Sequence, residues 1–301
     1  MVKKKLMKQK KLRQQTKRKR SFIPRVFIPK TSQEVISYMF KDVDEKTNIF
    51  KINDEEYSIC IEYTDVSFAK ANDEEAENIF FKWLEYLHSF REDNHISVIN
   101  AGTPIKTEKY KERFIFDTDS IEDSNQLQIA EELNTIITNS LGSNEETLQT
   151  KRFVVISLKA RNFLEANALF LNMFIKTEQK FKELKSKITL VSIKERLKFL
   201  YNFFNVESLE TRGIENIITY AKENNMSIFD VIAPKKISMR ESDFIEIDDK
   251  KFLRVLYVSK LPKSITPRFY NRLTTLEEIN LITTLNISPT NSAKMIKQVD
   301  K

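Results

Sequence analysis

Two segments of the chain alternate apolar and polar residues with a period of two, residues 49–52 and 57–63. The polar stretch 53–56 separates them, so the sequence predicts a β-hairpin. A helix is predicted next, from about 73 to 90, because apolar residues recur there at helical spacing and acidic residues crowd its first turn. The positions of that apolar stripe are Ala76, Ile79, Phe80, Trp83, Leu84 and Leu87.

Similar patterns continue to about residue 205. A first helix is predicted over 33–40, capped at Thr31 and Ser32. The polar segment 143–150 is predicted to be a loop. The further predicted strands are 96–99, 153–156 and 188–191, and the further predicted helices are 120–141, 161–185 and 193–204.

A second hairpin is predicted in the last third of the chain, where residues 244–247 and 252–258 flank the polar turn 248–251. A short helix at 214–223 and an apolar run at 228–234 come before it. After it we expect a helix over 266–273, a strand over 279–285 and a last helix from 289.

Helices interleaved with strands predict an α+β fold, with mixed sheets, helices packed on one face and two ferredoxin-like α+β modules. Residues 50–57 and 245–252 match in character position by position, which favours two related modules; convergence on the same hairpin chemistry explains the match equally well. The expected divisions are a basic arm and linker at 1–30, a first module at 31–205, and a connector with a second module at 206–301.

The composition limits the possible chemistry. The chain has 301 residues, with 22 Phe but only 3 Gly, and no two glycines have the spacing of a Walker-type phosphate loop. We therefore expect no catalysis and no cofactor in this chain.

Charge is concentrated at the N-terminus. The first twenty residues include eleven basic residues and no acidic residue, which predicts a disordered basic arm. Anionic lipid, nucleic acid and an acidic protein are its candidate partners, and lipid or protein comes first because no aromatic residue precedes Phe22. A solvated tail without a partner is the alternative. The basic residues are Lys3, Lys4, Lys5, Lys8, Lys10, Lys11, Arg13, Lys17, Arg18, Lys19 and Arg20.

Few other residues suggest chemistry. Cys60 is interpreted as a strand cysteine, and the two histidines, His88 and His95, as structural, because zinc needs several Cys or His ligands. The carboxylate pairs are interpreted as turn or helix-start residues: Asp117 with Asp119, Glu122 with Asp123, and Asp248 with Asp249. The Phe stripe of helix 161–185 is interpreted as core, with a partner-binding face as the alternative.

No stretch reaches the roughly 20 apolar residues that span a bilayer. The longest candidate, 168–175, is too short, and no apolar segment follows the basic N-terminus as in a secretory signal. We therefore expect a cytoplasmic protein, with any membrane contact peripheral.

A series of short segments follows a recognisable order. They are Ser32–Met39, Tyr57–Ile59, Ile61–Phe68, Ile79–Phe80, Leu87–Phe90, Ile96–Asn100, Lys151–Ser157, Leu197–Phe204, Asp230–Pro234 and Leu253–Leu261. In this order the chain resembles the N-terminal region of the conjugative-transfer ATPases of type IV secretion systems, the TraC/TraE/TrbE/CagE-type traffic ATPases, in the form encoded by Gram-positive mobile elements. The resemblance covers about residues 30–301.

The resemblance implies an assembly and docking domain of a DNA-transfer channel, which contacts channel subunits and the membrane surface and supports a homo-oligomer. No catalytic residue is implied, because the chain stops before the nucleotide-binding core of that family. The last predicted helix reaches Lys301 without a cap or breaker, so the resemblance implies such a core, with ATP and Mg²⁺, in a longer parent protein; a naturally short protein is the alternative. The alternative function is a nucleic-acid-binding accessory protein of a mobile element that uses the basic arm.

Overall fold

Strand β3 (Glu56–Tyr63) is the centre of the fold, because successive residues on both of its faces are buried. The computed structural model describes residues 29–64, 73–106, 115–118, 121, 123–140, 146–240, 243–258 and 281–289. Tyr57, Ile59 and Ile61 lie in one core on one face of the sheet, and Cys60 lies in a separate cluster on the other. Alternate side chains of a strand point to opposite faces, so β3 separates two cores.

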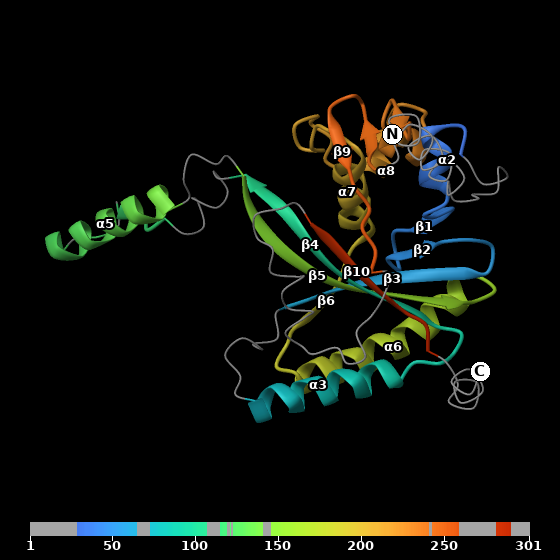
Figure 1. Cartoon of the computed structure of the whole chain (residues 1–301), viewed down its shortest axis with the longest axis horizontal. Coiled ribbons are helices and arrows are strands. Elements are labelled where there is room, and N and C mark those ends of the chain that lie inside the picture. Colours follow the sequence, from blue (N-terminus) through green and yellow to red (C-terminus); the bar gives the residue numbers. More distant parts are fainter. Residues whose placement is uncertain are drawn as a thin grey trace, which may run out of the picture.

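A β-α-β-β-α-β unit forms around β3 (Figure 1). Its strands lie in the order β6-β3-β5-β4, and each neighbouring pair is antiparallel. This is the ferredoxin-like arrangement that the sequence predicts for the first module. The elements are β3, α3 (Asp73–His88), β4 (His95–Lys106), β5 (Glu146–Lys159), α6 (Phe163–Glu183) and β6 (Ile188–Leu190).

Three further strands extend this sheet to seven. β1 (Asp42–Asp44) and β2 (Ile49–Lys51) form a hairpin, and β2 pairs with the start of β3 on the edge where β6 pairs with its end. β10 (Ile282–Ile287) pairs with β4 at the opposite edge of the sheet.

The sheets differ from the expected mixed type, because every pairing between described strands is antiparallel. The helical connections explain this result. α3 returns the chain to a strand that runs parallel to β3, but β5 lies between these two strands and runs in the opposite direction. The α+β class itself is confirmed.

Helices cover both faces of the large sheet, not one. α3 and α6 lie side by side below it in Figure 1, where α6 contributes Phe170 and Phe181 to the core. α7 (Ile193–Phe204) lies on the opposite side, and its Phe199 packs against Phe153 of β5. Apolar residues on both faces of β3 and β5 explain why one helical layer is not enough.

A second core lies on the α7 side of the sheet. It includes Ile36, Phe50, Leu197, Ile218 and Ile247, which come from five different elements. These contacts cross the boundary expected between residues 205 and 206, as does the pairing of β10 with β4. The remaining elements of this part are α2 (Ser32–Ser37), α8 (Ile217–Glu223), α9 (Ile228–Ile232), β7 (Ile237–Ser238), β8 (Ile245–Ile247) and β9 (Lys251–Leu253).

The small sheet β7-β8-β9 is an antiparallel meander, with no helix between its strands. It therefore lacks the β-α-β-β-α-β order expected of a second ferredoxin-like module. The helix predicted over 266–273 and the last helix, predicted from 289, lie outside the described residues.

The β4–β5 hairpin is longer than the sequence predicts. Its pairing runs from His95 with Ser157 out to Lys106 with Glu146, so β5 begins inside the segment expected to be a loop. The polar residues of that segment suit a two-stranded ribbon that leaves the body of the sheet. Helix α5 (Ser124–Ser140) lies beyond the end of this ribbon in Figure 1.

Candidate interaction surfaces

The eleven predicted binding residues of the basic arm, Lys3 to Arg20, lie outside the described residues. The described chain starts at Pro29, directly before α2. α2 packs on α9 through the second core, and the rings of Phe40 and Phe229 lie 5.2 Å apart. Pro29 therefore lies on the side of the large sheet that carries α7 and β9 (Figure 1).

Cys60 is a buried residue of strand β3, as the sequence predicts. Burial raises the pKa of its thiol to about 11, and the nearby Arg196 only partly opposes this shift. A thiol is nucleophilic as the thiolate, so a buried, protonated Cys60 is suited to packing and unsuited to catalysis.

The histidines and the described carboxylates have structural surroundings. His88 and His95 are exposed, and Nδ1 of His95 lies 3.3 Å from the Ser288 hydroxyl. Asp123 accepts hydrogen bonds from the backbone N–H groups of Asn125 and Gln126, which caps the start of α5. Within the described ranges, no group of three or more His, Cys, Asp and Glu residues is placed to hold a metal ion.

Only some of the remaining carboxylates lie within the described residues. Asp119 and Glu122 lie outside it, and Asp117 is exposed. Asp248 and Asp249 both have positive φ, 51° and 57°, which is the turn geometry that the sequence predicts between β8 and β9.

The Phe stripe of α6 is core. Phe170, Phe181 and Leu184 are buried, and Phe163 and Phe174 pack against the same cluster. The opposite side of the helix also holds apolar residues, since Leu164, Leu171 and Ile175 are exposed. The prediction of a core stripe is confirmed, and the helix has a second apolar stripe that the sequence interpretation did not separate from it.

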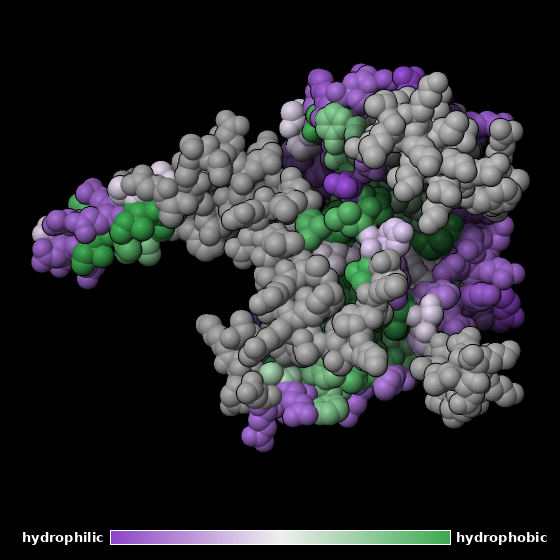
Figure 2. Space-filling model, in the orientation of Figure 1, coloured by the Kyte–Doolittle hydropathy of each residue, from purple (hydrophilic) through white to green (hydrophobic). Residues whose placement is uncertain are grey.

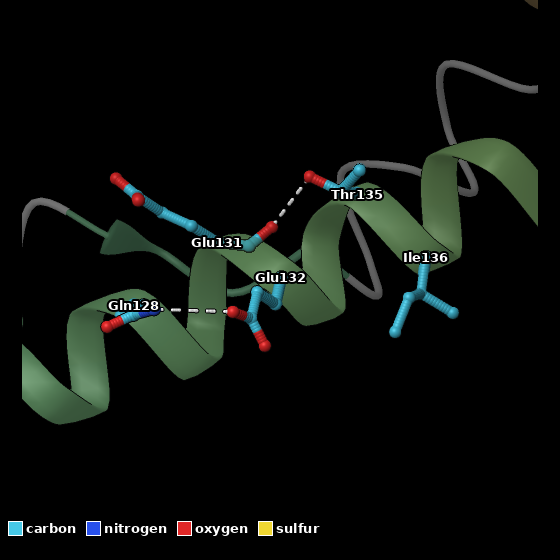
Figure 3. Close-up of a pocket in the computed structure, with 5 residues that line it drawn as sticks. All are labelled: Gln128, Glu131, Glu132, Thr135 and Ile136. Atoms are coloured by element: carbon cyan, nitrogen blue, oxygen red, sulfur yellow. Dashed lines mark hydrogen bonds between the residues drawn. The ribbon is translucent and has the colours of Figure 1, made fainter.

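Among the described residues, the hollow of about 500 Å³ in Figure 3 is lined by one helix only. Its lining side chains come from α5, and a 3.4 Å hydrogen bond joins Gln128 to Glu132. Ligand pockets usually enclose most of a small molecule between several elements. The residues lining this hollow are Gln128, Glu131, Glu132, Thr135 and Ile136.

Helix α5 has an exposed apolar stripe of Ile129, Leu133 and Ile136, at i, i+4 and i+7. Figure 2 shows apolar surface along one side of the projecting helix. Another side is covered: Ala130 is buried, and the Asn134 amide exchanges hydrogen bonds of 2.8 and 3.0 Å with the backbone of Phe116. The exposed stripe therefore belongs to a helix with its own local support.

A second exposed apolar surface begins in strand β9 and continues beyond its end, at residues 252–258. Val255, Leu256 and Tyr257 are 76%, 75% and 85% exposed, and Phe252 is 60% exposed. The sequence interpretation missed this surface, because it placed 252–258 in a strand of the second hairpin, whereas β9 ends at Leu253. One signal was available: from Lys250 to Leu276 the sequence has seven basic residues and no acidic residue.

Arg196 connects the two cores. Its guanidinium donates to the backbone carbonyl of Ser58 at 3.0 Å and to the Ser58 hydroxyl at 3.1 Å. It also lies over the ring of Phe50, 3.7 Å from the centroid. Burial lowers the pKa of Arg196 to about 10, so the side chain stays cationic at neutral pH and holds α7 against the sheet.

Lys251 performs a similar role for the small sheet. Its Nζ donates to three backbone carbonyls at the end of α7, those of Asn202, Phe203 and Asn205. These carbonyls lack helical partners, and a cation there also suits the helix dipole. Burial lowers the pKa of Lys251. This contact fixes β9, and with it the start of the exposed surface, to α7.

None of the helices in the described part of the chain is both long enough and apolar enough to cross a bilayer. Compared with models of known families and with curated proteins, the chain gives no match. The exposed apolar surfaces on α5 and after β9 are the features from which we argue a function.

Proposed function

We propose that this protein is an assembly module, in which the ferredoxin-like unit presents helix α5 to partner proteins. The exposed stripe of Ile129, Leu133 and Ile136, held beyond the body of the sheet, is the observation that supports it. The ordered resemblance of its segments to conjugation ATPases suggests the setting, a type IV secretion channel at the inner face of the cell membrane.

The stripe is suited to helix-in-groove recognition. Apolar residues at i, i+4 and i+7 form one side of a helix, and such a side binds in an apolar groove of a partner. Burying apolar surface contributes roughly 25 cal/mol per Å². Glu131 and Glu132 are the only charged residues of α5, so a groove with a basic rim fits this helix. Channel subunits and a second copy of the chain are the candidate partners.

Co-purification with the channel subunits tests this function. In the full chain, the triple variant Ile129→Ser, Leu133→Ser and Ile136→Ser is expected to lose the partner and keep its thermal unfolding midpoint. A matched control replaces the exposed Leu164, Leu171 and Ile175 of α6 by Ser and should bind as the parent does. Partner binding by the α5 variant at the parental level contradicts the proposal.

Nucleic-acid binding is the second candidate, favoured by eleven basic residues without an acidic one in the first twenty. Neutralised phosphates release counterions, so binding by the arm would fall steeply with salt. Deletion of residues 1–20 should then remove most of the salt dependence of DNA binding. A shallow slope that the deletion leaves unchanged contradicts this candidate.

We propose no catalysis for this chain; by the resemblance, ATP and Mg²⁺ would be bound by a separate domain. Purified chain incubated with ATP and Mg²⁺ is expected to release no phosphate above the buffer level. ATP hydrolysis that co-elutes with the chain through successive chromatography columns would show that it is an enzyme and would contradict the proposal.

A further inference from the structure

The surface after β9 combines exposed apolar side chains with basic ones. Phe252 and the segment 255–258 are all more than half exposed, and Phe244 packs edge-on against Phe252 with ring centroids 5.4 Å apart. In Figure 2, apolar surface lies where β9 and the chain leaving it lie in Figure 1. Lys250 and Arg254 are exposed beside these residues.

The stretch of sequence that forms this surface is basic. The sequence from Lys250 to Leu276 has seven basic residues and no acidic one, and its described part, 250–258, includes three of the seven. The acidic Asp249, just before it, is paired with Lys236. An anionic partner therefore fits this surface, and Pro29, where the described chain starts, lies on the same side of the large sheet.

We propose that the surface formed by Phe252, Arg254 and residues 255–258 inserts into an anionic lipid bilayer. Apolar and aromatic side chains enter the boundary between headgroups and acyl chains, while Lys and Arg remain at the lipid phosphates. This inference rests on the membrane-surface part of the proposed function and is independent of the protein contact through α5.

Lipid fits the surface better than nucleic acid does. Single-stranded nucleic acid binds by stacking its bases on aromatic rings. Val255, Leu256 and Val258 have no ring to stack on, yet they are 56–76% exposed. Branched aliphatic side chains beside cations are typical of residues that enter a lipid interface.

The position of the surface also suits this role. Lys251 holds β9 to the end of α7 through three hydrogen bonds, so the surface starts from a fixed strand. α3 and α6 lie on the opposite side of the large sheet (Figure 1). A bilayer on the β9 side would leave the exposed stripe of α6 in water, which makes that stripe a suitable control.

Vesicle co-sedimentation of the full chain tests the inference. Vesicles of phosphatidylcholine alone are compared with vesicles that include phosphatidylglycerol. The triple variant Val255→Ser, Leu256→Ser and Tyr257→Ser is expected to bind the anionic vesicles with an affinity reduced by about tenfold. The control triple variant Leu164→Ser, Leu171→Ser and Ile175→Ser should bind as the parent does. Thermal unfolding of both variants verifies that they are folded.

A fluorescence measurement separates insertion from surface attraction. A Tyr257→Trp variant should shift its emission to shorter wavelength when anionic vesicles are added, and a Leu164→Trp variant should not. Deletion of residues 1–20 should weaken binding at low salt and leave this shift in place at saturating lipid, since the arm contributes charge and the β9 surface contributes insertion.

Three results would overturn the inference. One is anionic-vesicle binding by the Val255/Leu256/Tyr257 triple variant at the parental level. Another is equal binding to neutral and anionic vesicles. The third is a loss of single-stranded DNA binding by this variant while its vesicle binding is unchanged, which would make the surface a nucleic-acid site. The α5 triple variant is expected to bind vesicles normally, so failure of the protein contact and failure of the lipid contact are distinguishable.

Discussion

The guanidinium of Arg196 on α7 lies over the ring of Phe50 on β2, with 3.7 Å between Cζ and the ring centroid. The same guanidinium donates two hydrogen bonds to Ser58 of β3. One side chain thus connects a helix of the second core with two strands of the large sheet. Arg is suited to this position because a planar guanidinium can stack and donate at once.

Replacing Arg196 by Met is expected to destabilise the protein by about 3 kcal/mol, since charged hydrogen bonds and a stacked cation are lost together. Urea unfolding monitored by circular dichroism measures this loss. Arg161→Met is the control, because the Arg161–Glu165 pair lies at the surface and should change stability by less than about 0.5 kcal/mol. Equal effects of the two substitutions would show that the Arg196 contacts contribute little.

Lys251→Met is expected to cost about 1–2 kcal/mol, because three carbonyls at the end of α7 lose their donor and the helix dipole loses its cation. The neighbouring Lys250 is exposed, and Lys250→Met should leave the unfolding free energy nearly unchanged. Hydrogen exchange gives a second reading: amides in the last turn of α7 should exchange faster in Lys251→Met only.

Cys60 is expected to lower the stability of the folded protein at alkaline pH. Its thiol pKa is about 11 when folded, against 9.0 as the ordinary value, so the protonated thiol favours the folded state. That contribution is complete below pH 9 and is lost as the pH rises through 11. We expect the parent to lose about 2–3 kcal/mol more than Cys60→Ala between pH 9 and 11, measured by urea unfolding at each pH. Parallel pH profiles would contradict this.

Phe181→Ala is expected to destabilise the protein by about 3–5 kcal/mol, because the ring is fully buried between α3 and the sheet. Its ring lies within 6 Å of the rings of Tyr63, Trp83 and Tyr86. Leu164→Ala, on the exposed side of the same helix, should cost less than about 0.5 kcal/mol. Thermal and urea unfolding measure the stability of both variants. A larger loss of stability in Leu164→Ala than in Phe181→Ala would be incompatible with the observed core.

Local signals in the sequence predicted several elements closely. Helix α7 has the bounds predicted, 193–204, and a capping box of Ser192 and Glu195 sets its start. The β8–β9 turn was predicted from Asp248 and Asp249, which tolerate positive φ. In both cases the determining residues are within four positions of the boundary that they set.

Features that depend on distant partners were not predictable in the same way. The polar residues at the start of β5 gave no strand signal, since their pairing with β4 alone makes them a strand. The sequence did not predict that helices cover both faces of β3. The residues on its second face, Ser58 and Cys60, are less hydrophobic than Ile59 and Ile61 and do not resemble core residues. Exposure after Leu253 was missed because an apolar run is typical of a buried strand.

The pairing of β10 with β4 joins residues that are about 180 positions apart, such as Ile282 with Ala101. During synthesis, β3, β4, β5 and β6 can pair once residue 190 has left the ribosome, whereas the outer edge of β4 stays open for nearly a hundred further residues. An open strand edge invites pairing with other chains. The nascent protein is therefore most vulnerable to aggregation in this interval, and a chaperone that binds extended apolar segments would act on β4 before the chain itself supplies the last strand.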